Sequence, residues 1–438
     1  MSASPVIYIP DLYTPPITSP NYKLEVTAYP EAKDALSNGL LRLRTDHVSG
    51  AKDLATNAIF SLVRIAEIIA ERLIEEVRND ETEAHGGKLR GTPHSALETW
   101  WESCRKAGWI LSKYGRPSMN AAITSAIVKA LDRKRLGLVD LDEEMVYDRY
   151  GACGVKRGLS GCDGDNRGTR EEKCIRLAVE RMHVYLMERY ENATRTRIAT
   201  GLQQFLYQKG ALEGQRRVVK ILTLSSSATV MNALVTVLDI ENSENWDGGL
   251  EIRLRIMESR PLCEGVNFAR DLVHGAQTVG ATDRLHIEIA SDASVAILAR
   301  DVDVVLLGAD RISDSGDVSN KTGSLPAVLC AKAVSDGVSV VVVSDLDKIS
   351  KPGAMEAYRE EENDSRELER LWGPHPAGTI KPFFWLTMVE TRNVYFEWVP
   401  ARYIDRYICE TGILDLNGIR EQSEEVLNAE RRLFGCFS

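Results

Sequence analysis

The hydrophobic pattern changes along the chain, from helical spacing in the first half to short apolar runs in the second. Between Glu31 and Asn79, apolar residues recur every three or four positions, which is typical of helices packed on a core. The clearest series is Leu54, Ala58, Leu62, Ile65, Ile69 and Leu73. Further helical stretches follow as far as Tyr207, so we expect an N-terminal helical domain.

From about Gln208, strand-like and helical segments alternate. The expected strands are Arg217–Leu224, Leu250–Met257, Arg284–Ala290, Val302–Leu307, Val338–Ser344 and Asn393–Val399. The expected helices between them are Thr229–Leu238, Val266–Leu272, Ala293–Arg300 and Leu325–Val334. This alternation predicts an α/β fold with a doubly wound parallel sheet. The last stretch, Ala401–Glu430, is predicted to be helical with one break at Gly412.

Shifts in composition predict how the chain is divided. We expect a Pro-rich extended tail over residues 1–22, a helical domain over 23–208 and a sheet domain over 209–438. Five prolines in the tail disfavour helix. Polar, charged or Gly-rich stretches predict insertions near 79–95, 138–173 and 351–375.

The composition is that of an ordinary globular protein, with 44% hydrophobic and 27% charged residues. A formal net charge of −10 argues against a general nucleic-acid binder. No apolar run is long enough to span a bilayer and no secretory segment is evident, so we expect a cytoplasmic protein without a membrane partner. Cys153, Cys162 and Cys174 are too widely spaced for a CxxC-type zinc site, and we predict neither a metal nor a cofactor.

The stretch Asp301–Lys332 carries the strongest candidate chemistry. Its apolar run, Val304–Leu307, predicts a buried strand, and Asp310 follows at the carboxyl end. A Gly-punctuated loop with Asn320 and Lys321 then leads into a helix. Ligands of open α/β sheets bind outside the carboxyl ends of strands, and this set suits an anionic, hydroxyl-bearing ligand. The alternative is a tight β-to-α connection in which the Asp caps its own loop.

Arg311 follows Asp310 directly, and further candidates with hydroxyl or cationic groups follow the other strands. These are Ser225, Ser226, Ser227, Arg260 and Lys348. The three serines open a helix, where hydroxyl and backbone N–H groups can bind phosphate, although a Ser-rich helix cap is a common alternative. Together with Asp310, which can take a hydroxyl or a proton, these cations have the make-up of a sugar-phosphate pocket.

Four segments carry recognisable motifs: Gly115–Ser118, Glu258–Gly265, Gly308–Ser324 and Asn393–Leu414. Together they resemble one superfamily, which unites the α/β/δ regulatory subunits of translation initiation factor 2B with the methylthioribose-1-phosphate and ribose-1,5-bisphosphate isomerases. The resemblance covers roughly Lys33 to Leu414. It implies an N-terminal helical domain on a C-terminal Rossmann-like domain, with dimerisation through the latter.

The resemblance also assigns roles to residues. In these isomerases, a Cys after the first strand and the Asp of GlyAlaAsp handle protons as an aldose 1-phosphate becomes a ketose. Asp310 matches that Asp, whereas Ser225 stands at the Cys position. A Ser hydroxyl is a far weaker acid than a thiol, whose pKa is about 8.5, and it would be a poor proton shuttle without an adjacent base. Ser49 stands where the isomerases have Arg before GlyAla, so a phosphate contact is lost there.

Three functions fit these residues. The principal hypothesis is a regulatory protein like the factor 2B subunits, which binds a phosphorylated sugar or nucleotide through a degenerate isomerase site. The alternatives are an active aldose–ketose isomerase, of the ribose-1,5-bisphosphate or methylthioribose-1-phosphate type, and a scaffold with a vestigial pocket. We expect a homodimer, with paralogous subunits as further partners. The expected catalytic residues are Asp310 and Ser225, and the expected ligand-binding residues are Ser49, Gly50, Ser226, Ser227, Arg260, Asn320, Lys321 and Lys348.

Overall fold

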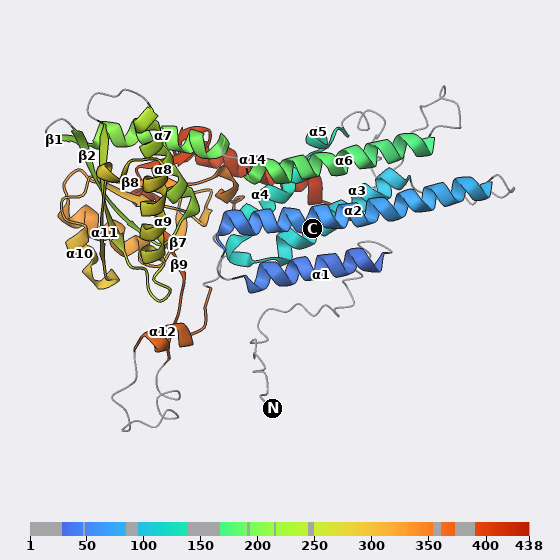
Figure 1. The fold of residues 1–438 in the computed structure, drawn as a ribbon. Helices are drawn as coiled ribbons and strands as arrows, with labels where there is room; N and C mark the ends of the chain where they lie inside the picture. The colour runs from blue at the N-terminus through green and yellow to red at the C-terminus, as the bar shows by residue number, and fades with distance from the viewer. Residues whose placement is uncertain are drawn as a thin grey trace.

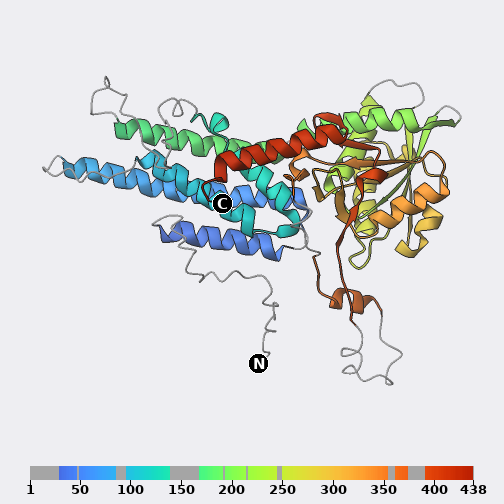
Figure 2. The same ribbon diagram turned by 180° about the vertical axis from the view of Figure 1, so that it is seen from behind.

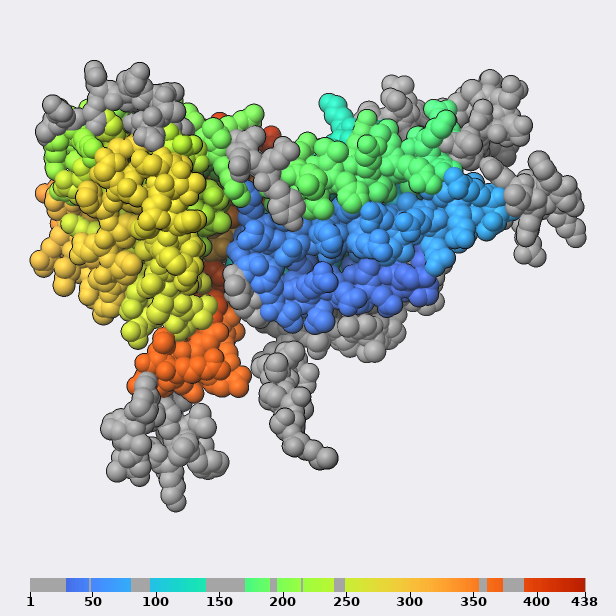
Figure 3. All heavy atoms as spheres, viewed as in Figure 1, coloured from blue at the N-terminus to red at the C-terminus, as the bar shows by residue number. Residues whose placement is uncertain are grey.

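The structure is a computed structural model in which a bundle of long helices lies beside a sheet flanked by helices (Figure 1). It describes residues 29–46, 49–84, 95–138, 167–190, 193–213, 216–243, 249–353, 361–372 and 390–437. The predicted Pro-rich tail lies outside the described residues, as do large parts of the three predicted insertions. In the space-filling view, the helical part and the sheet part meet along a seam, and α12 (Arg366–Leu371) lies below the sheet part (Figure 3).

The N-terminal part is helical, as predicted. Its helices are α1 (Pro30–Thr45), α2 (Ala51–Ala84), α3 (Ala96–Tyr114), α4 (Asn120–Ala130), α5 (Arg133–Leu136) and α6 (Arg167–Tyr190), with the 3-10 turn η2 (Pro117–Met119) between α3 and α4. Every residue of the apolar series on α2 is buried in the core of this part. Trp100 is fully buried there, and its Nε1–H donates to the Ala66 carbonyl at 3.0 Å. The α2 stripe therefore forms a packing surface.

The described strands of the main sheet confirm the predicted α/β fold. In space they run β11–β10–β8–β5–β2–β3–β4, with β1 paired to β2. Their bounds are β1 (Ala211–Glu213), β2 (Arg216–Leu224), β3 (Leu250–Met257), β4 (Leu285–Ala290), β5 (Val304–Leu307), β8 (Ser339–Val343), β10 (Arg406–Cys409) and β11 (Gly412–Leu414). The strands from β10 to β4 pair in parallel, and their order corresponds to the 3-2-1-4-5-6 order of the Rossmann fold.

Helices cover both faces of this sheet. One face packs against α7 (Ala193–Lys209), α8 (Ala228–Ser243) and α9 (Glu264–Thr278). The other packs against α10 (Val295–Leu298), α11 (Ser324–Val334) and the start of α14 (Leu416–Phe434). α7 precedes the boundary predicted at residue 209 and nevertheless packs on the sheet; the division into domains stays a prediction.

The strand register brings the carboxyl ends of the parallel strands together. Leu224 pairs with Met257 of β3, and Leu222 pairs with Val305 of β5. The residues that follow these strands therefore gather at one edge of the sheet. β2 and β5 are neighbours although β3 and β4 lie between them in the sequence, so the strand order reverses at this pair.

Two predictions about the C-terminal segments were wrong. The predicted strand Asn393–Val399 contributes β9 (Phe396–Val399) to a separate small sheet, where it pairs with β7 (Val318–Lys321), which pairs in turn with β6 (Arg311–Ile312). The stretch Ala401–Glu430 is helical only in α14, because β10 pairs in parallel with β8 and turns back into β11. Tyr407 and Ile408 favour a strand and bury their side chains, and Gly412 turns the hairpin at a φ of 118°.

Helix α14 joins the two parts of the molecule, and Figure 2 shows it crossing from the sheet to the helical bundle. Near its start, Ile419 packs in the sheet core and Ser423 donates to the Ser350 carbonyl at 2.6 Å. Near its end, Leu433 and Phe434 pack in the helical core. One continuous helix therefore fixes the bundle relative to the sheet.

A buried ionic cluster joins the same two parts. Asp347, in the turn η6 (Leu346–Lys348), accepts hydrogen bonds from Ser125 at 3.0 Å and Arg189 at 2.7 Å, and pairs with Lys129. Burial opposes the charge of Asp347, but Lys129 and Arg189 hold its pKa below the ordinary value. The cluster thus anchors η6, which carries Lys348, to helices α4 and α6.

Replacing Asp347 tests this anchor. We expect Asp347→Asn to lower the free energy of unfolding by about 3 kcal/mol at pH 7, measured by chemical denaturation, because two cations lose their buried counterion. The lowered pKa means that the wild-type advantage is present above pH 4 and shrinks as the pH falls further. Asp364→Asn removes an exposed partner of Arg366 and should change stability by less than about 0.5 kcal/mol. Equal effects of the two substitutions would contradict an anchoring role.

Candidate functional site

The tips of β2 and β5 touch where the strand order reverses. A Cβ atom added to Gly308, just after β5, would lie 2.8 Å from Ser227 Oγ. The same Cβ would lie 3.8 Å from Asn320 Oδ1. Glycine at 308 therefore lets the start of α8 approach β7 closely, which places two of the predicted residues, Ser227 and Asn320, at the switch point.

Ser225 is held in an unusual backbone conformation at the end of β2. Its φ is 64°, in the left-handed region that a non-glycine residue rarely adopts. Its N–H donates to Ser259 Oγ at 2.7 Å, and its own hydroxyl donates to Glu264 Oε2 at 3.0 Å. Ser259 itself has a φ of 61°. Two strained residues on adjacent strand tips thus fix the direction of the Ser225 hydroxyl.

The neighbouring serines serve the start of α8. Ser227 accepts a hydrogen bond from the Val230 N–H at 3.3 Å, so it caps the helix. Ser226 is exposed beside it. Ser227 therefore acts as the helix cap that was the alternative. The backbone N–H groups at this helix N-terminus can still bind an anion.

Glu264 is a member of the site that the sequence analysis did not single out. It begins α9, and its Oε1 lies 3.1 Å from Lys321 Nζ. Lys321 also lies over the Tyr395 ring, with Nζ 4.3 Å from the ring centroid. Glu264 therefore joins the tip of β2 to Lys321 at the end of β7, and it places a carboxylate beside the Ser225 hydroxyl. The only sequence signal was its place in the motif Glu258–Gly265.

Asp310, which is partly buried, and Lys348, which is buried, form the inner part of the site. Burial raises the pKa of the Asp310 carboxyl, and the nearby Lys348 and Lys321 ammonium groups oppose this rise. Lys348 is 6% exposed. Among the described residues, no carboxylate lies within ion-pair distance of its Nζ. Lys348 is thus a buried cation without an ion-pair partner in the described part of the chain, and it lies near Asp310, whose protonated form is favoured by burial. This combination makes the surroundings of Lys348 a candidate anion site.

Asn320 lies between these groups on β7. Its side-chain N–H donates to Ser324 Oγ at 2.9 Å, and that hydroxyl donates to the Lys321 carbonyl at 2.6 Å. These bonds fix the amide and direct its oxygen toward Gly308, so that Asn320 offers an acceptor at the switch point.

Other predicted residues lie elsewhere. Arg260 is about half exposed and pairs with Glu258 at 2.8 Å. Arg311 is buried and donates to the carbonyls of Pro117 and Ser118, so it joins the sheet part to the helical part. Arg260 is therefore engaged at the tip of β3, and Arg311 at the junction of the two parts.

Ser49 and Gly50 precede α2. The Ser49 N–H is bound by Asp46 Oδ1 at 2.8 Å, and the Gly50 carbonyl accepts the first helical bond from Leu54. Arg116, a cation of the helical part, contacts the same segment. It is buried, donates to the Asp46 carbonyl at 2.6 Å and pairs with Glu361. Arg116 also lowers the pKa of Asp310, so this part of the helical bundle faces the site. The charge of Arg116 is already matched by Glu361.

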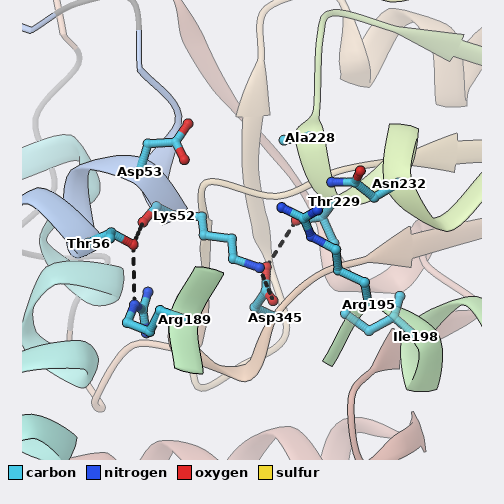
Figure 4. A pocket seen from close by; sticks show the side chains of 10 residues that line it. All are labelled: Lys52, Asp53, Thr56, Arg189, Arg195, Ile198, Ala228, Thr229, Asn232 and Asp345. Atoms are coloured by element: carbon cyan, nitrogen blue, oxygen red, sulfur yellow. Dashed lines mark hydrogen bonds and ion pairs between the residues drawn. The ribbon is translucent and has the colours of Figure 1, made fainter. Parts of the chain in front are cut away.

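A polar cavity of about 60 Å³ lies between α2, α7 and α8, and the first residues of α8, Ala228 and Thr229, line it (Figure 4). Lys52 lies 3.8 Å from Asp345 there, and Thr229 donates to the same carboxylate at 2.9 Å. Arg189, also in its wall, is paired with Asp347. Since carboxylates match these cations, this cavity is a weaker anion site than the surroundings of Lys348.

No group of three or more His, Cys, Asp or Glu side chains is arranged to hold a metal ion within the described ranges. In those ranges no helix combines the length and apolar character needed to cross a bilayer. Cys153 and Cys162 lie outside the described residues.

Comparison with known proteins gives a family and a chemistry for the relatives. The family model described as the initiation factor 2 subunit family matches residues 151–416, more than half of the chain. Methylthioribose-1-phosphate isomerase of Synechococcus sp. is 31% identical over 169 residues, which cover 38% of this chain and 44% of that protein. The isomerase of the same name from Pseudomonas savastanoi is 26% identical over 250 residues, covering 56% of this chain and 62% of that protein. The matched regions thus span less than two thirds of these relatives.

Solved structures share the fold at low identity. Methylthioribose 1-phosphate isomerase from Pyrococcus horikoshii aligns over 90% of this chain and 87% of its own, with 18% identity and a TM-score of 0.50. Subunit beta of eIF2B from Chaetomium thermophilum aligns over 90% and 92%, with 12% identity and a TM-score of 0.53. These structures support the same two-part architecture.

The raised pKa of Asp310 predicts an unusual stability effect. Because folding disfavours the charged carboxylate, Asp310 opposes folding as the pH rises through its folded pKa. We expect Asp310→Asn to raise the Tm at pH 7, with the gain disappearing at acid pH, as measured by calorimetry from pH 4 to 8. Asp301→Asn is the matched control: Lys220 lowers the pKa of that exposed carboxylate, so its loss should slightly lower the Tm. A pH-independent loss of Tm in Asp310→Asn would contradict the burial of a disfavoured charge.

Proposed function

Because the chain belongs to the initiation factor 2 subunit family, we propose that it binds an aldose 1-phosphate at the switch point and converts it into the ketose 1-phosphate. One observation carries the proposal: Asp310 and the buried Lys348 lie at the same strand edge as Ser225, Glu264 and Lys321. The isomerase names of the relatives support this chemistry over the regulatory function that the sequence analysis put first.

The proposed reaction conserves composition. The hydrogen on C2 moves to C1 together with its bonding electron pair, and the bond from C1 to the ring oxygen breaks with its electron pair left on that oxygen. The ring oxygen gains a proton and the C2 hydroxyl loses one, so that its O–H electron pair becomes the second bond of the ketone. The site must therefore contain one group that gives a proton and one that takes a proton.

The described residues suit these tasks. Lys348 would bind the phosphate, because a buried ammonium gains most from an anionic partner. Asn320 and the N-terminus of α8, with Ser226 and Ser227, would bind phosphate or hydroxyl oxygens. Asp310 would give the proton to the ring oxygen, since a raised pKa keeps a carboxyl group protonated nearer neutral pH.

One observation favours a second function, ligand binding without turnover. Ser225 stands where the resemblance places a thiol, and a Ser hydroxyl does not ionise near neutral pH. A protein that binds a phosphorylated sugar or nucleotide without turnover, as a regulatory subunit, would need the binding residues alone. This function predicts ligand binding that Asp310→Asn leaves intact and no ketose formation.

We also propose a homodimer through the sheet part. The described sheet ends at β4, and large apolar side chains are exposed around this edge, including Val266, Ile289 and Ile297. A second copy would cover them and the unpaired strand edge. Paralogous subunits could occupy the same edge, and light scattering of the purified chain separates a dimer from a monomer.

Turnover tests the main proposal. We expect purified protein to convert methylthioribose 1-phosphate or ribose 1,5-bisphosphate into the ketose, followed by NMR of the sugar carbons. Asp310→Asn should lower kcat at least about 100-fold, because it removes a proton donor. Asp301 is exposed and precedes β5, whereas Asp310 follows it. Asp301→Asn should therefore retain activity. Binding of both sugars without any ketose would favour the regulatory function instead.

Lys348 should determine affinity. We expect Lys348→Met to weaken binding of a ketose 1-phosphate by about 10–100-fold in calorimetry, since a hydrogen bond to a charged group contributes about 1.5–3 kcal/mol. Lys52→Met removes a cation that already pairs with Asp345 in the wall of the polar cavity, and it should change affinity by less than about twofold. If Lys52→Met weakens binding more than Lys348→Met, the ligand binds in that cavity and the proposed site is wrong.

A further inference from the structure

The contact between Ser225 and Glu264 has a consequence beyond binding. We propose that these two residues form a hydroxyl–carboxylate dyad that takes the proton of the substrate's C2 hydroxyl. The inference rests on the proposed isomerase function and names the group that accepts a proton in it. Ser225 faces the ligand, and Glu264 acts through it. Glu264 is therefore a residue that positions the Ser225 hydroxyl and accepts its proton.

The geometry gives each oxygen of Glu264 its own task. Oε2 accepts the Ser225 hydroxyl at 3.0 Å, and Oε1 lies 3.1 Å from Lys321 Nζ. Because the Ser225 hydrogen points at Glu264, the lone pairs of Oγ remain available for a proton from the ligand. Lys321 compensates the charge of the carboxylate while Oε2 holds the hydroxyl.

The backbone around the dyad keeps it in place. Ser225 has a φ of 64° and its N–H is bound to Ser259 Oγ, so the residue cannot relax into an ordinary extended conformation without losing that bond. Cys263, immediately before Glu264, also has a positive φ of 53°. Strain of this kind costs on the order of 1–3 kcal/mol per residue and persists where surrounding contacts enforce it, often at functional sites.

The proton balance of the dyad's step is simple. The C2 hydroxyl gives its proton to Ser225 Oγ as the Ser225 hydroxyl gives its own proton to Glu264 Oε2. The electron pair of the broken substrate O–H bond forms the ketone, while Asp310 protonates the departing ring oxygen. Exchange with water then moves one proton from Glu264 back to Asp310, which restores both groups for the next turnover.

A purely structural Glu264 makes a different prediction. If its role were only to pair with Lys321 at the start of α9, its loss would have the same effect whatever residue occupies position 225. If it accepts the proton of Ser225, a thiol at that position would release its proton with much less help, because a thiol has a pKa of about 8.5. The identity of residue 225 therefore separates the two roles.

The experiment compares Glu264→Gln in the wild-type and Ser225→Cys backgrounds. With Ser225 present, we expect Glu264→Gln to lower kcat at least about 100-fold and to change KM less than about threefold, because the carboxylate acts in the chemical step. In the Ser225→Cys background the same substitution should lower kcat less than about tenfold. Glu288→Gln, an exposed carboxylate on β4 paired with Arg255 at 3.4 Å, should leave kcat unchanged. Calorimetric binding of a ketose 1-phosphate checks that every variant is folded.

Each outcome decides the inference. An active wild type with Glu264→Gln at full kcat overturns the dyad and leaves the proposed function standing. Equal losses in the Ser225 and Ser225→Cys backgrounds also overturn it, in favour of a structural Glu264. A wild type that binds the sugar phosphate without turnover overturns both the dyad and the isomerase function.

Discussion

The pairing of β2 with β5 is the constraint on which the site depends. Ile221 pairs with Val304 and Leu222 with Val305, so two strands that are separated by β3 and β4 in the sequence end side by side. A shift of this register would separate Ser225 from Asp310 and would expose apolar side chains of the sheet core to solvent. The crevice outside this pair is where open α/β sheets bind ligands, and the chain fills it with polar groups.

Charge matching then distinguishes one cation from the others. Lys321 pairs with Glu264, Arg260 with Glu258, and Arg116 with Glu361, so their charges are compensated within the protein. Lys348 is more buried than Lys321 and no ion pair to it occurs in the described residues. A ligand phosphate would supply the missing counterion, and the Asp347 cluster holds the turn that carries Lys348 against the helical part.

The sequence predicted this site where chemistry follows a strand directly. Asp310 follows the apolar run of β5, and the serines follow Leu224 at the end of β2. Knowing where these two strands end was therefore enough to predict that these residues lie at one edge of the sheet. Glu264 could not be placed in this way, because it reaches Ser225 only after the loop from β3 folds back toward β2. Arg260 follows β3 as expected, but its guanidinium pairs with a local partner, Glu258, and its role in binding stays a prediction.

The same limit applied to the fold. Parallel strands with continuous apolar runs were predicted almost to the residue, whereas β10 is short and flanked by charged residues, and it forms only because β8 offers an unpaired edge. Helix α14 was predicted as part of one long helical stretch, and its role in joining the two parts depends on packing that no local pattern encodes.

Lys348 and Asp310 are expected to bind one ligand between them. A crystal structure of the protein with a bound ketose 1-phosphate would show whether they do. We expect the phosphate within hydrogen-bond distance of Lys348 Nζ, the hydroxyl formed from the ring oxygen beside Asp310, and the C2 carbonyl beside Ser225 Oγ. A phosphate bound instead among Lys52, Arg189 and Arg195, with the switch point unoccupied, would contradict this expectation.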